Sequence, residues 1–317
     1  MTHVSVRRGM LYVTIAATIW GTGGPVAAVL YQVSGLGPVA VSFWRFVFGA
    51  GVLFAAAQVT GIGRPRPVGS GGSRPAWAGL LVVGSGLAVS QAAYFGAVAE
   101  SGVAMATVVT LGASPALVAL GARLLLREAL GRAGALSMGL AMLGLLLLVG
   151  GPSATSAAGV GLALLSAIAY AGVTLHSRAS TRHHGATRPG SSPARDAHGT
   201  AMWGFAVGGV LLLPVAAAEG LFPGGGQVTT IALLGYLGAM PTAVAYSLFF
   251  TGLSSVRATT ASMVALLEPA GATAIGVLVL GERLTPSSAA GAAVLLASVA
   301  LLALGESRED SRSGKYE

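Results

Sequence analysis

Two ionisable residues, Arg45 and Glu268, lie inside long apolar stretches of the sequence. Glu268 stands in the run TTASMVALLEPAGATAIG, which is apolar on both sides of the carboxylate. A carboxylate in the middle of a bilayer is costly unless it is paired, protonated or in contact with water, so its presence indicates a functional interior. The chemistry open to it is binding of a solute or exchange of protons near neutral pH. The alternative is a structural carboxylate, kept neutral or bonded to a neighbouring helix.

Arg45 lies in SFWRFVFGAG, about two turns from the outer end of its predicted helix. Two interpretations are open for it. The side chain could extend to the membrane interface, as long basic side chains do near helix ends. It could instead be a cation inside a cavity, where it binds an anionic group or pairs with Glu268. The sequence does not establish whether the two charges meet, because that depends on helix rotation.

Four aromatic residues lie within apolar runs rather than in the interfacial belt where Trp and Tyr usually gather. They are Trp20, Tyr94, Tyr170 and Tyr246. Their ring faces and hydroxyls could line a pocket for an organic solute, although simple packing would explain each of them alone. We predict a substrate cavity formed by these four residues together with Arg45 and Glu268.

Four prolines within the same runs are predicted kinks or hinges: Pro25, Pro115, Pro241 and Pro269. Pro269 directly follows Glu268 and cannot donate a hydrogen bond to the carbonyl of Ala265. We therefore expect the helix to bend there and to leave that carbonyl free beside the carboxylate. Irregular transmembrane helices often coincide with binding sites in transporters.

Signatures of other chemistry are missing from the sequence. It contains no cysteine, which excludes disulfides, thiol nucleophiles and cysteine metal sites. It also contains no GxSxG, HExxH or Walker glycine loop, so we predict neither enzymatic activity nor a cofactor. His183, His184 and His198 could suggest a metal site, but with Asp196 as the one carboxylate nearby we predict a solvated basic loop and no metal.

The elements that must position these residues are membrane-spanning helices. Hydrophobic residues make up 54% of the 317 residues and charged residues 9%, where a soluble domain carries about 25%. Apolar runs long enough to cross a bilayer recur ten times, and the alternation that marks a membrane β-barrel is absent. We predict an all-α integral membrane protein with spans at residues 10–31, 38–60, 76–98, 103–126, 131–150, 157–178, 200–219, 228–252, 257–280 and 287–305. The Pro-, Gly- and Ser-rich segments 61–75 and 179–199 are expected to be flexible loops.

The distribution of basic residues predicts the orientation. With the amino terminus in the cytoplasm, sixteen lysines and arginines fall inside and only Arg283 outside, in agreement with the positive-inside rule. Both termini, including the tail 306–317, are then cytoplasmic, which suits a multi-pass protein of the cell membrane. The net charge of +8 is thus assigned to membrane loops and not to binding of nucleic acid.

The chain also looks duplicated. A shift of 154 positions places Pro115 on Pro269 and Glu128 on Glu282, with Ser114 where Glu268 stands in the second copy. The predicted copies are residues 10–150 and 157–305, with five spans each. Because five is odd, the second copy should be inverted relative to the first.

Several short motifs resemble the EamA family of the drug/metabolite transporter superfamily. They are WG at 20–21, WRF at 44–46, Pro115 followed by Glu128, LEP at 267–269 and GERLT at 281–285. The resemblance implies a secondary carrier, often an exporter of amino acids or other small metabolites, with alternating access to a central cavity between the copies. It transfers family motif positions to Trp20, Arg45, Glu268 and Pro269. The second copy lacks a counterpart of WRF, which puts a charge site paired by the repeat in doubt.

The predicted function is transport of a small organic metabolite, amino-acid-like or drug-like, by alternating access. The resemblance to the family implies export, and protons are a candidate coupling ion. A flippase for a lipid-linked headgroup is the alternative, and a membrane sensor or partner subunit is a third hypothesis from another class. The expected partners are the solute, the lipid bilayer and protons, and no nucleic acid. The solute, the direction, the coupling ion and the oligomeric state stay open.

Overall fold

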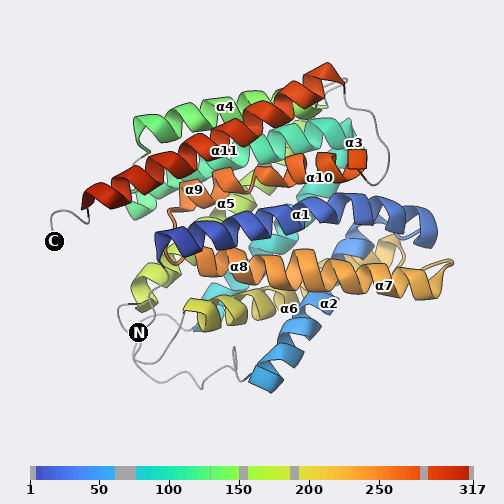
Figure 1. The fold of residues 1–317 in the computed structure, drawn as a ribbon. Helices are drawn as coiled ribbons and strands as arrows, with labels where there is room; N and C mark the ends of the chain where they lie inside the picture. The colour runs from blue at the N-terminus through green and yellow to red at the C-terminus, as the bar shows by residue number, and fades with distance from the viewer. Residues whose placement is uncertain are drawn as a thin grey trace.

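The computed structural model describes residues 5–60, 76–128, 130–149, 156–185, 193–278 and 285–313 as a bundle of helices (Figure 1). Within these residues there is no β-strand. The α-helices and the two π-helical segments, η1 and η2, follow one another as α1 (Val6–Ser34), α2 (Pro38–Thr60), α3 (Ala76–Gly121), η1 (Ala122–Leu126), α4 (Arg132–Val149), α5 (Ala157–Gly185), α6 (Pro193–Glu219), α7 (Gln227–Leu237), η2 (Gly238–Val244), α8 (Ala245–Gly252), α9 (Ala258–Val264), α10 (Leu267–Leu278) and α11 (Pro286–Ser313).

The predicted all-α membrane architecture is confirmed in its main features. Seven helical stretches of the described chain have the length and apolar composition needed to cross a membrane, and they coincide with seven of the ten predicted spans. The predicted fifth and tenth spans correspond to shorter apolar helices, at 132–148 and 286–302. The predicted ninth span is the pair α9 and α10. The inverted relation of the two copies stays a prediction.

Gly102 separates the predicted third and fourth spans inside α3. Its backbone has φ 77° and ψ 164°, a conformation that is essentially restricted to glycine. The helix therefore ends and restarts at this residue, and the chain reverses through the membrane within one labelled element.

The predicted loop 179–199 is wrong in its extent. α5 runs on to Gly185 and α6 already begins at Pro193, so only residues 186–192 lie outside the described chain. Asp196 in the first turn of α6 interacts favourably with the partial positive charge of the helix N-terminus, which helps the helix to begin before the membrane. In the same way α11 continues to Ser313, beyond the predicted span and into the predicted tail. The predicted loop 61–75 lies outside the described residues.

The two halves of the chain are interleaved. α3 packs along α5, α4 along α11, α2 along α6, and α1 against both α8 and α10. Figure 1 shows α4 and α11 together at one side of the bundle and α1 between α10 and α8. Each of these contacts joins a helix of the predicted first copy to a helix of the second, so the interior is built from both copies.

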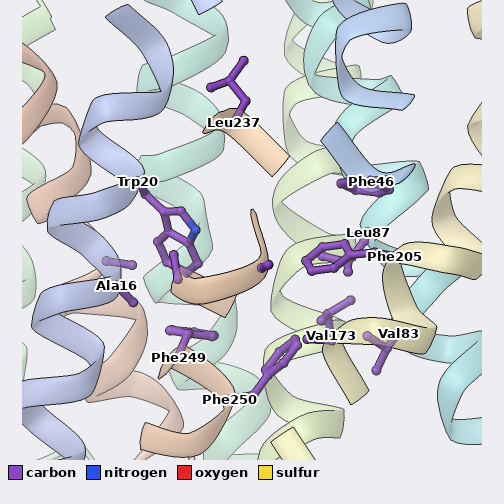
Figure 2. Packing of buried hydrophobic residues seen from close by; sticks show 14 of the residues in the cluster. Ala16, Trp20, Phe46, Val83, Leu87, Val173, Phe205, Leu237, Phe249 and Phe250 are labelled. Carbon is purple, nitrogen blue, oxygen red and sulfur yellow. The ribbon is translucent and has the colours of Figure 1, made fainter. Parts of the chain in front are cut away.

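Aromatic rings fill much of the interior between α1, α2, α6 and α8 (Figure 2). Phe46 of α2 and Phe205 of α6 have ring centroids 5.1 Å apart, and Phe249 and Phe250 of α8 are 6.0 Å apart. Tilted and edge-to-face pairs of this kind contribute about 0.5–1.5 kcal/mol each beyond the burial of their area. These ring contacts fix the rotation of α8 about its axis and the positions of the α8 side chains that face the interior.

The prolines affect their helices differently. Pro241 lies in η2 and has no backbone N–H to donate to the carbonyl of Leu237 four residues earlier. The hydroxyl of Thr242 donates to that carbonyl at 2.7 Å, so the carbonyl has a partner within the π-helical segment. Pro25 and Pro115 lie inside α1 and α3, and both helices continue through them.

Pro269 follows a short interruption of its helix. α9 ends at Val264 and α10 begins at Leu267, so the predicted single helix is interrupted just before Glu268. The expectation that the carbonyl of Ala265 would be free is wrong, because the backbone N–H of Glu268 donates to it at 3.0 Å. The chain tightens to bonds between residues three apart, and this closes the gap that the proline would otherwise leave.

Candidate functional site

Glu268 occupies the first turn of α10, directly after the helix break. Its side chain is half-buried. Among the described residues its carboxylate makes no hydrogen bond and no ion pair. An unpaired carboxylate is stable at this depth only if it faces water, carries a proton or meets a ligand. The break thus presents the one ionisable group of α10 to the interior.

The backbone of α1 packs against the backbone of α10 at Glu268. A Cβ atom placed on Gly21 would lie 2.9 Å from the carbonyl oxygen of Glu268 and 3.0 Å from the backbone nitrogen of Ala272. The two helices therefore touch backbone to backbone, which only a glycine at this position allows. This contact fixes the place of α10, and with it the place of the carboxylate.

Arg45 supplies the positive charge of the site from α2. Its side chain is half-buried, and its Nε is buried with no hydrogen-bond partner in the described part of the chain. The guanidinium acts electrostatically on Glu268 and on Tyr246. No ion pair joins Arg45 to Glu268 in the part of the chain that the structure describes. The two opposite charges therefore interact without direct contact among the described residues.

The three tyrosines of the predicted cavity come from three different helices. Tyr94 of α3, Tyr170 of α5 and Tyr246 of α8 all interact electrostatically with Glu268. The hydroxyl of Tyr94 is held by Thr107 at 2.9 Å. The hydroxyl of Tyr170 interacts with Thr174 one turn further along α5, and the Tyr170 ring packs near that of Phe249. The ring of Tyr246 packs edge-on against Phe205.

Trp20 completes the set from α1. Its ring lies 4.9 Å from that of Tyr246 in an edge-on arrangement. It also lies 5.1 Å from the ring of Phe249 (Figure 2). Its indole Nε1 is buried and has no hydrogen-bond partner among the described residues. A buried donor of this kind is costly to leave unpaired, and it would gain a hydrogen bond from a ligand with an acceptor group.

Each of the six residues predicted for the cavity has a ring contact or an electrostatic interaction with at least one of the others, and they come from six helices: Trp20, Arg45, Tyr94, Tyr170, Tyr246 and Glu268. That they line one substrate cavity stays a prediction. Sequence reasoning missed two neighbours. Phe249 packs on both Trp20 and Tyr170, and Tyr31 interacts electrostatically with Arg45. The spacing of three residues between Tyr246 and Phe249 would have placed both rings on one helix face.

The predicted hinge prolines and the histidines are not among the six predicted cavity residues. Pro269 follows Glu268, and Pro241 lies near α1, since a Cβ atom on Gly23 would be 3.7 Å from its side chain. Pro115 is buried within α3. Within the described residues no group of three or more His, Asp or Glu could hold a metal ion, and the Nε2 of His198 forms a hydrogen bond with the Leu53 carbonyl at 2.9 Å.

Comparison with known proteins agrees with this architecture. The family model described as the EamA-like transporter family matches residues 7–150 and again 157–304. The chain is 28% identical over 311 residues to the uncharacterized transporter YwfM of Bacillus subtilis, which covers 96% of this chain and 97% of that protein. It is 27% identical over 319 residues to the uncharacterized inner membrane transporter YicL of Salmonella typhimurium, which covers 98% of this chain and 99% of that protein. A crystal structure with 20% identity superimposes with a TM-score of 0.74 over 93% of this chain and 98% of its own, which shows a shared fold.

Proposed function

Because the chain belongs to the EamA-like transporter family, a family of multi-pass membrane transporters, we propose that it carries a small organic solute across the membrane by alternating access. The proposed direction is export, and the proposed location is the cell membrane with both termini in the cytoplasm. Glu268 and the other five predicted cavity residues form the proposed binding site. Pro25, Pro115, Pro241 and Pro269 are the proposed hinges of the conformational change.

The observation that carries the proposal is the pair of unpaired opposite charges. Arg45 and Glu268 lie close enough to interact electrostatically, yet they form no ion pair among the described residues. A solute with an ammonium and a carboxylate group satisfies both charges at once, with the carboxylate on Arg45 and the ammonium on Glu268. The rings of Trp20 and Tyr246 then contact its apolar part. The site therefore favours an amino-acid-like zwitterion.

A drug-like cation is the rival within the same function. It would bind to Glu268 and the aromatic rings, and it would leave Arg45 without a partner. A thermal-shift screen of the purified protein separates the two, because a ligand stabilises the folded state by mass action. We expect stabilisation by amino acids and none by their decarboxylated or deaminated analogues. Stabilisation by hydrophobic cations alone would overturn the zwitterion and favour the rival.

A second candidate function, a flippase for a lipid-linked headgroup, has one observation in its favour. An apolar groove of about 410 Å³ lies between α1, α10 and α11, with Thr18, Gly271 and Leu296 in its lining. Leu278 and Leu296 of this groove are exposed on the outside of the bundle, so an acyl chain could enter it from the membrane. Stabilisation by lipid-linked sugars, with none by soluble solutes, would support the flippase.

Replacing Arg45 by glutamine should weaken binding of an amino acid at least tenfold. The neutral amide keeps much of the side-chain volume but loses the charge that the carboxylate of the solute needs. Titration of the thermal shift with the amino acid measures the change. Arg123 is a suitable control, because it lies in η1, the π-helical segment that follows α3. Arg123→Gln should bind the solute as the natural protein does. Unchanged binding in Arg45→Gln would contradict the assigned role.

The proposed orientation can be tested by labelling, because the natural chain has no cysteine. Ser5 lies at the start of α1, and Phe222 is 80% exposed between α6 and α7, so the two are predicted to lie on opposite sides of the membrane. A membrane-impermeant maleimide should label Phe222→Cys on intact cells and Ser5→Cys only after permeabilisation. The reverse pattern would place both termini outside.

A further inference from the structure

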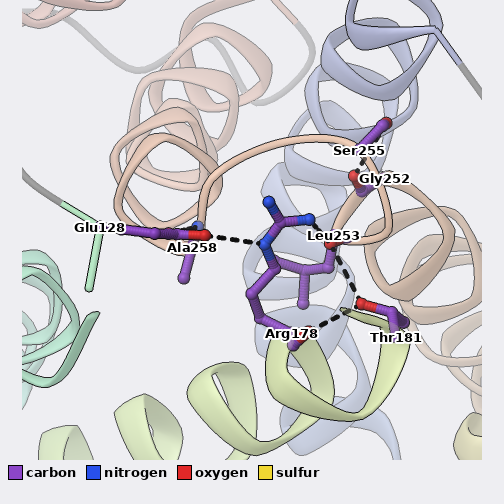
Figure 3. Close-up of polar contacts among 7 residues, drawn as sticks. All are labelled: Glu128, Arg178, Thr181, Gly252, Leu253, Ser255 and Ala258. Atoms are coloured by element: carbon purple, nitrogen blue, oxygen red, sulfur yellow. Dashed lines mark hydrogen bonds and ion pairs between the residues drawn. The ribbon is translucent and has the colours of Figure 1, made fainter. Parts of the chain in front are cut away.

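A buried ion pair lies outside the proposed binding site, between Arg178 of α5 and Glu128, next to the start of α9 (Figure 3). The Nε of Arg178 donates to Oε1 of Glu128 at 3.0 Å, and the side chains are only 10% and 8% exposed. Nη1 of Arg178 also donates to the carbonyl of Leu253 at 2.7 Å. The second carboxylate oxygen of Glu128 accepts from the backbone N–H of Ala258 at 3.2 Å. We name these four groups the latch.

The latch joins the two repeats. Glu128 belongs to the first matched segment, whereas Arg178, Leu253 and Ala258 belong to the second. The chain reaches Glu128 through η1 and through Arg127, whose left-handed backbone turns it back towards α5. The latch therefore connects α5, the turn after α8 and the start of α9 to the end of the first repeat's fourth span.

Two elements lead from the latch to the proposed binding site. On α5, Tyr170, Thr174 and Arg178 follow one another at intervals of four residues and so lie on one face, about 12 Å from end to end. Thr174 is completely buried and donates to the Tyr170 carbonyl at 3.0 Å. On the other side, α9 runs from Ala258, which Glu128 caps, to the break just before Glu268. All seven residues of α9 are buried.

We propose that the latch closes the solute path at this end of the bundle and must open once in each transport cycle. The inference rests on the proposed transport function. A buried ion pair contributes little net stability, because desolvation of the two charges offsets their attraction. When the end opens, both charged side chains return to water, so the open and closed states differ little in free energy. α9 moves with the latch and carries the change to Glu268.

Access to Thr174 tests the latch, because the side chain lies behind it and the chain has no other thiol once Thr174→Cys is introduced. In membrane vesicles, an impermeant maleimide is applied from the side on which Ser5→Cys is labelled. We expect slow labelling of Cys at position 174 when the latch is intact. Adding Glu128→Gln with Arg178→Gln removes both charges together, so no unpaired charge is buried, and should raise the labelling rate at least tenfold.

Two further variants keep the test decisive. Arg178→Lys retains a positive charge beside Glu128 and should give an intermediate rate. Glu100→Gln removes a carboxylate whose one hydrogen bond within the described residues is from the Ser156 hydroxyl at 3.2 Å, near the start of α5, and it should leave the labelling rate unchanged. Each variant is first shown by size-exclusion chromatography and thermal unfolding to be folded. If the double variant fails to fold, the labelling rate of Arg178→Lys is compared with the rate of the intact latch. A faster rate supports the proposal, and an equal rate contradicts it.

The result is independent of solute binding, which is measured separately by thermal shift. Faster labelling in the double variant, with solute binding kept, supports the latch. An unchanged labelling rate in the folded double variant overturns the latch, whether or not a solute binds. Faster labelling in a protein that binds no solute of any tested class supports closure by the latch and overturns the proposed function instead.

Discussion

Replacing Glu268 by glutamine is expected to abolish transport and to leave the fold intact. Glutamine has nearly the same shape, and the carboxylate that it replaces makes no hydrogen bond or ion pair among the described residues, so no structural contact is lost. What is lost is the negative charge that the ammonium of the solute needs in an interior of low dielectric constant. Uptake of the amino acid found in the thermal-shift screen into proteoliposomes measures the effect, and we expect a loss of at least a hundredfold.

The same variant distinguishes binding from proton coupling. If Glu268 only binds the solute, Glu268→Gln should fail to bind it at every pH. If Glu268 also exchanges protons, the variant should bind the solute weakly, and the transport that remains should no longer depend on pH. Glu100→Gln provides the control for removal of a carboxylate far from the site. A Glu268→Gln protein that transports normally, with normal pH dependence, would show that the carboxylate is structural.

The sequence predicted the helices well because apolar runs of membrane length leave little alternative. The prediction failed at the C-terminal end of α5 and at the N-terminal end of α6. Both helices extend into residues 179–199, whose composition suggests a loop. The prediction also misplaced the effect of Pro269. The proline predicts a free carbonyl on Ala265, but a tighter turn lets the Glu268 N–H occupy that carbonyl, which only the backbone geometry reveals.

The candidate site could be predicted in part because its members are out of place in the membrane. Arg45, Glu268 and the mid-membrane tyrosines stand out by type and depth alone. The latch does not stand out. Arg178 was counted only as one of many basic residues on the inner side, and Glu128 only as part of the repeat. Their pairing joins residues 50 apart in sequence and depends on the rotation of α5, which no periodic pattern specifies.

A side chain on Gly21 is expected to have the largest structural effect of any single substitution near the site. The added Cβ would lie 2.9 Å from the Glu268 carbonyl oxygen and 3.0 Å from the backbone of Gly271 and Ala272. These neighbours are backbone atoms and cannot rotate away, so α1 and α10 must separate. Overpacking of this kind costs about 1–3 kcal/mol for small insertions. Gly21→Ala should lower the unfolding temperature by several degrees, and Gly21→Val should lower it further.

Gly51 of α2 offers a matched control, because a Cβ atom there would meet nothing within 4 Å. Alanine favours a helix over glycine by about 1 kcal/mol, so Gly51→Ala should be neutral or slightly stabilising. Binding separates a local from a global effect. If Gly21 positions Glu268 through the contact of the two helices, Gly21→Ala should weaken solute binding at least tenfold even at temperatures where the protein is fully folded. Equal stability and binding in Gly21→Val and Gly51→Val would show that α1 and α10 do not need this contact, and that the place of Glu268 is set by α9 and the helix break instead.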